Sequence, residues 1–258
     1  MKLGIIQGRL TVPKEGHQTT PENWQDEFTL INKLSLNHIE WNLNKEKLLN
    51  NPLFTSKIDQ VYVQQISSVC FDNVVSESIF DPEYFYRNVL ILIPLLTEIG
   101  INRITLPLVE EARLKSEEDL DKVKNYLNLC GENNSKLIIN IESDSEIYYT
   151  KSLINYSKNI HFTYDTGNIT AERYGHEEYL NNTIHKITNV HLKDREYGGN
   201  SVCNFKGDTN FDLIFSTLAK FKYDNLFTLQ MARGKTGKEE DIVKYYRDNF
   251  KERYALHF

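Results

Sequence analysis

The chain has 258 residues, of which 40% are hydrophobic and 12% aromatic, which is enough for a packed core and too much for an intrinsically disordered protein. Its net charge is −6 at pH 7, so the chain lacks the excess of basic residues expected of a nucleic-acid-binding protein. No apolar run approaches the roughly 18 residues of a membrane-spanning helix. Three widely spaced cysteines without a CxxC pair indicate free thiols. We therefore expect a cytoplasmic protein that binds neither nucleic acid nor membrane.

Short apolar runs alternate with helical patterns along the chain. We predict strands at 3–6, 36–41, 60–69, 101–106, 136–142, 159–165, 187–191 and 225–230. We predict helices at 20–34, 45–57, 81–98, 116–130, 145–156, 176–185, 211–221 and 239–254. This alternation predicts an α/β protein with a parallel sheet, and eight units predict closure into a single (β/α)₈ TIM barrel. No linker or composition break interrupts the chain, so we predict one domain over residues 1–258.

Three consecutive predicted strands end in a side chain that can ligate a metal. These side chains are Glu142, Asp165 and His191. In a (β/α)₈ barrel the carboxyl ends of the strands surround the mouth where active sites are built. Two carboxylates and one imidazole converging there suit one divalent metal ion, either Mn²⁺, Mg²⁺, Co²⁺ or Zn²⁺. A lone strand-end residue of any of these types is usually a cap or a surface residue, and only the succession of three favours a metal site.

Several motifs of the chain resemble those of the sugar phosphate isomerase/epimerase family, the xylose isomerase-like TIM barrels. The most specific are Tyr164-Asp-Thr-Gly-Asn168 and Val190-His-Leu-Lys-Asp194, and segments 4–9, 24–41, 68–70 and 207–211 are also similar. The resemblance extends over nearly the whole chain. It implies one divalent metal ion held by residues of strands five to eight, and a small-molecule sugar or sugar phosphate as the substrate.

The fourth metal position of that family is changed in this chain. The family's ligands are Glu, Asp, His and Glu, which here fall on Glu142, Asp165, His191 and Gln230. The carbonyl oxygen of Gln230 can ligate a hard cation, but its amide takes up no proton near neutral pH. The family's epimerases use both glutamates as bases on opposite faces of the substrate, so only Glu142 can serve as such a base here. Whether Gln230 ligates the metal or only forms a hydrogen bond beside it stays open.

The resemblance implies proton transfer next to a carbonyl. A metal chelating adjacent carbonyl and hydroxyl oxygens of a sugar makes the neighbouring C–H more acidic and stabilises the enediolate. Glu142 would act as ligand and as catalytic base. The return proton needs a second donor, for which Glu40, Lys193 and Asp194, all at strand ends, are candidates.

Further strand-end residues are candidates for substrate binding. They are Arg9, Glu40, Asn168, Lys193, Asp194, Arg195 and Arg233. Arginine is suited to bidentate binding of phosphate or carboxylate. The structural alternatives are ordinary surface arginines, a Glu40–lysine ion pair and an Asp194 that caps a helix or loop. Many members of the family have His where this chain has Asn168.

The strand-end residues and the family resemblance suggest four candidate functions. The first is a metal-dependent sugar or sugar-phosphate isomerase/epimerase, and the second is a related barrel dehydratase or lyase that expels hydroxide from the same enediolate. The third is a catalytically degenerate sugar-binding barrel, which Gln230 favours. The fourth is a base-excision nuclease of the related barrel group. It would need several strand-end histidines for a multi-zinc cluster, whereas this chain shows one convincing one, and the acidic net charge also counts against it. The sequence leaves open the substrate and the metal. It also leaves open the oligomeric state, for which a homo-oligomer is one alternative.

Overall fold

The strands of the protein form a closed barrel. The structure is a computed structural model, and it describes all residues except 13–19, 45–50, 56–57 and 76–78. Its barrel strands are β1 (Lys2–Ile6), β2 (Ile39–Asn42), β3 (Ile66–Cys70), β4 (Arg103–Leu108), β5 (Ile138–Ser143), β6 (Ile160–Asp165), β7 (Ile187–Leu192) and β10 (Leu226–Leu229). The order β1-β10-β7-β6-β5-β4-β3-β2 closes on itself. The predicted (β/α)₈ barrel is therefore confirmed.

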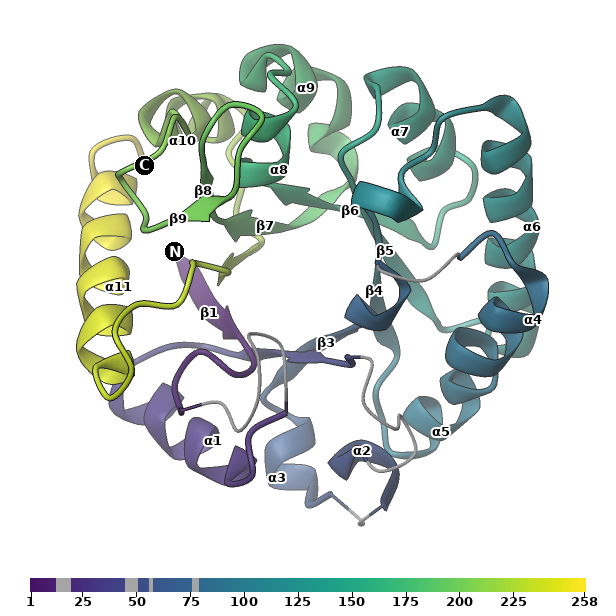
Figure 1. The fold of residues 1–258 in the computed structure, drawn as a ribbon, viewed down its shortest axis with the longest axis horizontal. Coiled ribbons are helices and arrows are strands. Elements are labelled where there is room, and N and C mark those ends of the chain that lie inside the picture. The colour runs from purple at the N-terminus through teal and green to yellow at the C-terminus, as the bar shows by residue number, and fades with distance from the viewer. Residues whose placement is uncertain (13–19, 45–50, 56–57, 76–78) are drawn as a thin grey trace. The chain divides into compact units, whose positions relative to one another are not determined.

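One compact unit comprises residues 1–39 and 163–258. In this unit β10 pairs in parallel with both β1 and β7, so Thr228 lies opposite Gly4 and His191. Its helices are α1 (Trp24–Lys33), α8 (Thr166–Ala171), α9 (His176–Thr183), α10 (Phe211–Lys220) and α11 (Glu239–Ala255), with a 3₁₀ turn at Ile184–Lys186. The last helix, α11, lies beside α1 (Figure 1), where Lys33 and Glu240 form a 2.6 Å ion pair.

Aromatic side chains fill the space between α10, α11 and β10. The ring of Phe250 lies 4.9 Å from the rings of Phe205 and Phe211, and Phe215 packs 6.0 Å from Phe227. Such edge-to-face and tilted contacts favour these rings beyond the area that they bury. The two C-terminal helices are thereby fixed to the last strand of the barrel.

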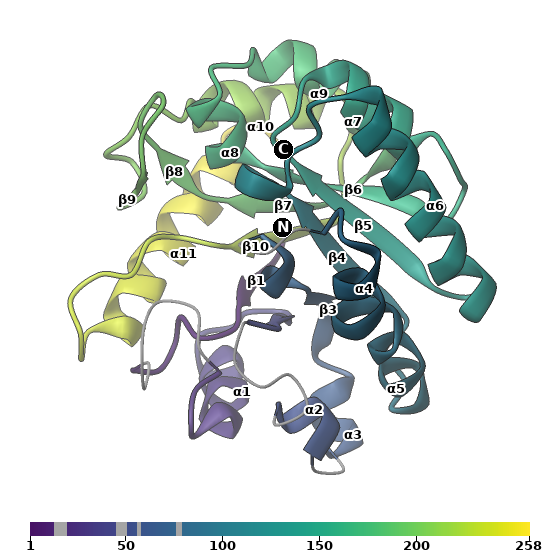
Figure 2. The ribbon, with the colours of Figure 1, turned by 45° about the vertical axis from the view of Figure 1, so that its right-hand side comes forward.

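A second compact unit comprises residues 40–162. Its strands β3, β4 and β5 are parallel neighbours, and Pro107 of β4 lies opposite Glu142 of β5. Its helices are α2 (Pro52–Thr55), α3 (Gln60–Val63), α4 (Pro82–Phe85), α5 (Leu92–Glu98), α6 (Glu117–Asn133) and α7 (Ile147–Ile154), with 3₁₀ turns at Asp72–Val74 and Glu110–Ala112. The helices α5 and α6 lie next to each other outside β4 and β5 (Figure 2).

Two predicted elements differ in this second unit. The strand predicted over 60–69 is the helix α3 followed by β3, because the side chain of Asp59 accepts a hydrogen bond from the Val61 N–H and caps a helical turn. The helix predicted over 81–98 is divided into α4, a π-helical turn at Tyr86–Leu90, and α5. Pro94 has no N–H to donate to the carbonyl four residues earlier, which explains the irregular turn before it.

The remaining differences concern helix starts and a hairpin. The helix predicted from residue 20 begins at Trp24, with Asn23 as its N-cap. Of the helix predicted over 45–57, residues 45–50 and 56–57 lie outside the described residues. The short antiparallel pair of β8 (Asp194–Arg195) and β9 (Ser201–Val202) is not predicted, because two-residue strands leave no hydrophobic pattern.

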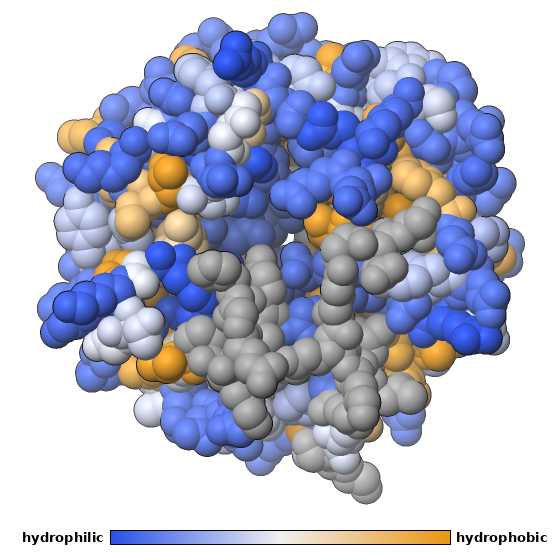
Figure 3. All heavy atoms as spheres, viewed as in Figure 1, coloured by the Kyte–Doolittle hydropathy of each residue, from blue (hydrophilic) through white to orange (hydrophobic). Residues whose placement is uncertain are grey.

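The exposed surface is mainly polar. On the face shown in Figure 3, hydrophobic residues form small patches between hydrophilic ones. Among the helices of the described residues, none has the length and apolarity needed to cross a bilayer.

Candidate metal centre

Three buried side chains at strand ends form the candidate metal centre. Glu142 is next to last in β5, Asp165 is the last residue of β6, and His191 is next to last in β7. One ligand atom from each lies within 4.8 Å of the others. Since metal–ligand bonds of about 2.1 Å place two ligands at most about 4.2 Å apart, small side-chain rotations suffice for all three to contact one ion. The structure thus brings together the three residues that the strand pattern singles out.

The two carboxylate oxygens of Asp165 have different partners. Oδ1 accepts a 2.7 Å hydrogen bond from the Asn168 N–H and caps α8. Oδ2 is buried and has no hydrogen-bond partner among the described residues. It lies 3.9 Å from His191 Nδ1 and 3.5 Å from Lys193 Nζ. A buried carboxylate oxygen without a hydrogen bond is costly unless a cation compensates it, so this oxygen fits a metal ligand.

Gln230 supplies a second buried oxygen of this kind. It directly follows β10, and its N–H donates a 3.1 Å hydrogen bond to the carbonyl of Leu192 in β7. Its side chain is buried, and within the described part of the chain Oε1 has no hydrogen-bond partner. Gln230 Oε1 therefore lies at the end of β10, next to β7, the strand that carries His191. A carbonyl oxygen at this position could serve as a neutral fourth ligand for a hard cation.

Glu40 is buried among hydroxyl groups. Its Oε1 accepts hydrogen bonds of 2.7 Å from both Ser68 Oγ and Thr105 Oγ1. The side chain is fully buried at the start of the second compact unit. These hydroxyls give its charge a polar environment, and its role toward a substrate stays a prediction.

Asp194 holds the loop that follows β9. Its Oδ2 accepts hydrogen bonds from the N–H groups of Lys206 (3.0 Å) and Gly207 (2.9 Å), and its Oδ1 accepts from Thr209 (3.2 Å). A Cβ atom at Gly207 would collide with Asp194 Oδ1, so the loop needs glycine at this position. The partners of this carboxylate favour the sequence alternative in which Asp194 caps a loop over its role as a proton donor.

Two cationic side chains meet beside Asp165. Lys193 Nζ and Arg195 Nη1 donate hydrogen bonds of 3.1 and 3.0 Å to Asn168 Oδ1. These three candidate substrate-binding residues are therefore brought together at the start of α8.

The other two candidate arginines bind backbone carbonyls. Arg9 Nε donates to the Met231 carbonyl at 3.0 Å. Arg233 donates from Nη1 to the Thr11 carbonyl at 3.2 Å and from Nη2 to the Gly8 carbonyl. Burial lowers the pKa of Arg233. Both arginines therefore connect the loop after β1 with the segment after β10.

Glu27 belongs to the same loop cluster and is absent from the sequence-based candidates. Its carboxylate is buried and accepts hydrogen bonds from the N–H groups of Gly8 (2.8 Å) and Leu10 (3.1 Å) and from Thr11 Oγ1 (3.2 Å). Burial raises the pKa of Glu27, while these hydrogen bonds lower it. The sequence does contain a signal that Glu27 is buried, because Glu27 lies between Trp24 and Ile31 on the apolar face of the helix.

We expect Glu27→Gln to lower the free energy of unfolding by about 1–3 kcal/mol, because its amide NH₂ cannot accept the bonds that one carboxylate oxygen now accepts. Urea denaturation at pH 7 measures this change. The matched control Asp26→Asn, at an exposed position of the same helix, should change the same quantity by less than about 0.5 kcal/mol. Equal effects of the two variants would show that Glu27 does not hold the loop.

A buried hydrogen-bond network surrounds the side chain of His176, at the start of α9. His176 Nε2 is 3.0 Å from Thr170 Oγ1, and its Nδ1 is 2.6 Å from the hydroxyl of Tyr164. Thr170 donates its only hydroxyl hydrogen to the Thr166 carbonyl at 2.7 Å, so its oxygen accepts from Nε2–H. Nδ1 then carries no hydrogen and accepts from Tyr164. Burial lowers the pKa of His176 to about 4, which keeps this arrangement neutral.

The lowered pKa of His176 predicts a pH-dependent stability. Between the ordinary value of about 6.5 and the folded value of about 4, the unfolded chain binds a proton at this residue and the folded protein does not. Acidification through this range should therefore destabilise the protein by up to roughly 3 kcal/mol. His176→Asn keeps an acceptor for Tyr164 but does not titrate. We expect the stability advantage of the wild type over this variant to shrink between pH 6.5 and 4 in urea denaturation, and a constant difference would contradict the assignment.

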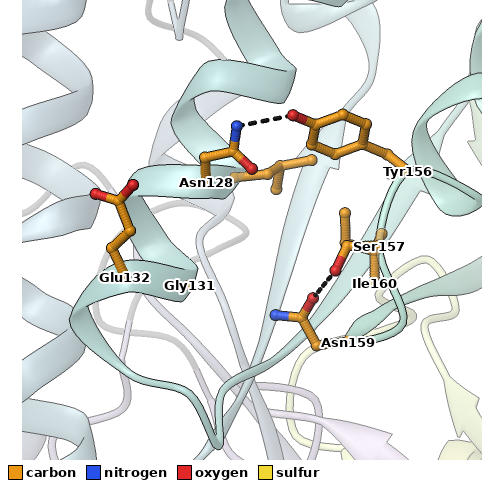
Figure 4. Close-up of a pocket in the computed structure, with 8 residues that line it drawn as sticks. Asn128, Gly131, Glu132, Tyr156, Ser157, Asn159 and Ile160 are labelled. Atoms are coloured by element: carbon orange, nitrogen blue, oxygen red, sulfur yellow. Dashed lines mark hydrogen bonds between the residues drawn. The ribbon is translucent and has the colours of Figure 1, made fainter.

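A shallow pocket of about 290 Å³ lies at the surface of the second compact unit, between α6 and the segment before β6 (Figure 4). Its polar side chains bind one another: Asn128 Nδ2 donates to the hydroxyl of Tyr156 at 2.7 Å, and Ser157 Oγ donates to Asn159 Oδ1 at 2.6 Å. None of the candidate ligands lines it. We assign it no functional role.

The comparisons with known proteins define the class of the barrel. No family model and no curated protein matches the sequence. Solved structures do match over almost the whole chain, and they are xylose isomerase-like barrels, among them several epimerases. The resemblance expected from the sequence motifs is thus confirmed, at the level of the fold.

Three of these structures illustrate the matches. The first is the IolI protein with a binding zinc atom, with a TM-score of 0.76 and 16% identity over 100% of this chain and 99% of that chain. The second is L-ribulose 3-epimerase, with a TM-score of 0.72 and 12% identity over 99% and 95%. The third is the probable 3-DHS dehydratase AsbF from Bacillus anthracis, with a TM-score of 0.70 and 14% identity over 97% and 99%.

Proposed function

We propose that this protein is a divalent-metal-dependent isomerase or epimerase of a sugar or sugar phosphate, with residues 1–258 as one domain. The buried triad and the zinc atom named for the similar IolI structure support a divalent metal site. The metal would be held by Glu142, Asp165, His191 and Gln230. The single observation that carries the proposal is the buried Oδ2 of Asp165, which has no hydrogen-bond partner in the described parts of the chain and lies 3.9 Å from His191 Nδ1. The epimerases among the matched structures support a sugar substrate.

The chain's own residues supply the proton chemistry. When bound, the metal ion would polarise adjacent oxygens of the substrate and so acidify the neighbouring C–H. Glu142 would remove this proton, because the other carboxylate of the triad, Asp165, is held by its hydrogen bond at the start of α8. Asp165 keeps its geometry through the hydrogen bond to the Asn168 N–H, so its orientation does not depend on the substrate.

A dehydratase or lyase is the second candidate function. Gln230 cannot carry a proton, and backbone N–H groups occupy Asp194, so Glu40 and Lys193 are the remaining candidates for a second proton donor. If neither takes part, Glu142 is the one base of the site. A one-base site suits elimination of a hydroxyl group as well as a proton transfer in which the same carboxylate returns the proton. The matched structure of a probable dehydratase supports this alternative. A sugar-binding barrel without catalysis is the third candidate, which Gln230 favours.

One experiment separates these functions. Purified protein is analysed for bound metal, loaded with Mn²⁺, and incubated with a panel of ketoses in deuterium oxide. Mass spectrometry then detects exchange of C–H for deuterium and loss of water from the substrate. Exchange without loss of water supports the isomerase, loss of water supports the dehydratase, and stoichiometric sugar binding without either supports the binding protein. Absence of bound metal after loading would overturn the metal-dependent proposal.

A further inference from the structure

Two positive charges share one neutral oxygen beside the candidate metal centre. Lys193 Nζ and Arg195 Nη1 both donate to Asn168 Oδ1, so the two cationic nitrogens lie within about 6 Å of each other, where like charges repel. The amide oxygen has two lone pairs and no charge. It can satisfy the two donors but cannot neutralise them.

The acidic side chains near Lys193 and Arg195 have other partners or roles. Asp165 Oδ2, at 3.5 Å from Lys193 Nζ, is the oxygen that fits a metal ligand. If this oxygen held a metal ion, the ion would compensate much of its charge, and Lys193 would be only partly balanced. Asp194 directs both oxygens at the N–H groups of the following loop, and the next acidic residue, Glu196, is exposed.

The two cationic side chains are held in place before any ligand arrives. A Cβ atom at Gly167 would lie 2.8 Å from Lys193 Cγ and 3.0 Å from Arg195 Cγ, so both stems pack directly on the glycine. Arg195 also donates from Nε and Nη2 to the Gly199 carbonyl, at 3.0 and 2.7 Å. Such a fixed arrangement lowers the entropy cost of binding a ligand.

We propose that Lys193 and Arg195 form an anion-binding subsite, and that the substrate carries a phosphate or carboxylate group bound there. This inference rests on the proposed function and narrows its substrate to the anionic members of the class. Both anions share the oxygen atoms that an ammonium and a guanidinium bind by charge-assisted hydrogen bonds. Asn168 accepts hydrogen bonds from both cations and Gly199 accepts from Arg195, so both act as positioning residues.

The first test measures binding of inorganic phosphate by isothermal titration calorimetry. Lys193→Gln and Arg195→Gln should each weaken binding at least tenfold relative to the wild type. The matched control Lys206→Gln removes one charge from an exposed side chain of the neighbouring loop and should leave binding unchanged. Equal affinity of Lys193→Gln and wild type would overturn the subsite, and melting temperatures verify that each variant is folded.

The second test compares deuterium exchange of a neutral ketohexose, its 6-phosphate and a keto acid in Mn²⁺-loaded protein. We expect kcat/KM to be at least tenfold higher for one of the two anions, and the preferred anion identifies phosphate or carboxylate. Lys193→Gln should remove this preference, whereas Lys193→Arg should retain most of it. Equal exchange of all three compounds would overturn the anionic substrate but not the proposed function. Loss of phosphate binding in Lys193→Gln without exchange of any compound would overturn the proposed function and leave the subsite standing.

Discussion

Replacing Asp165 with Asn is expected to abolish tight metal binding while leaving the fold intact. The asparagine Oδ1 can still accept the hydrogen bond from the Asn168 N–H that caps α8. The other oxygen becomes an NH₂ group, which cannot ligate a cation. We expect Mn²⁺ affinity to fall by at least about 100-fold, more than the loss of a hydrogen-bond partner of a ligand costs. Calorimetric titration of metal-free protein with Mn²⁺ measures the change.

Asp144 provides the matched control for this variant. It is a buried carboxylate two residues after Glu142, and it pairs with Arg113 through hydrogen bonds of 2.9 and 2.7 Å. Asp144→Asn should lower stability, because Arg113 loses a charged partner. It should still bind one Mn²⁺ per chain with wild-type affinity. If Asp165→Asn binds Mn²⁺ as tightly as this control does, the metal centre is located elsewhere.

Replacing Glu142 with Gln is expected to reduce substrate deuterium exchange by about 10²- to 10⁴-fold, the usual contribution of a catalytic base. The amide keeps the size of the side chain and an oxygen that can face a cation, but it cannot accept the proton. The rate is measured in deuterium oxide at saturating Mn²⁺, so that a weaker metal affinity does not contribute. Tight binding of the substrate should persist.

Glu146→Gln serves as the control for the base. Glu146 is exposed in the segment that follows β5, just before α7. Its variant should exchange substrate at the wild-type rate. Exchange by Glu142→Gln at the wild-type rate would show that another group removes the proton, and the fully buried Glu40 would be the next carboxylate to test.

The sequence predicted the parts of the molecule that follow a repeated pattern. Alternating apolar runs and helical patterns indicated the barrel, and the last polar residue of three such runs indicated Glu142, Asp165 and His191. The barrel prediction is confirmed, and the three side chains lie close together, because burial of a parallel strand forces an apolar run and leaves polar groups only at its ends. The role of these side chains as metal ligands stays a prediction. The motifs around Asp165 and His191 also led to the resemblance that the structural comparison confirms.

Features that depend on tertiary contacts were not predictable in this way. The position of Glu27 on the apolar face of its helix indicates burial, but only the structure shows that its carboxylate binds the N–H groups of the loop after β1. His176 forms its network with residues six and twelve positions away, which no period reveals. The start of β3 was misplaced because the apolar residues of α3 resemble a strand, and the capping hydrogen bond of Asp59 decides between the two.

The division of the chain into a continuous and a discontinuous unit has a consequence for biosynthesis. Residues 40–162 form one uninterrupted stretch, so their contacts are available as soon as that stretch has left the ribosome. The first strand, β1, also pairs with β10, which is translated long after it. Contacts between such distant segments are slow to form. One edge of β1 therefore stays unpaired until β10 has been translated, and a nascent chain that lacks β10 exposes this edge to chaperones and proteases.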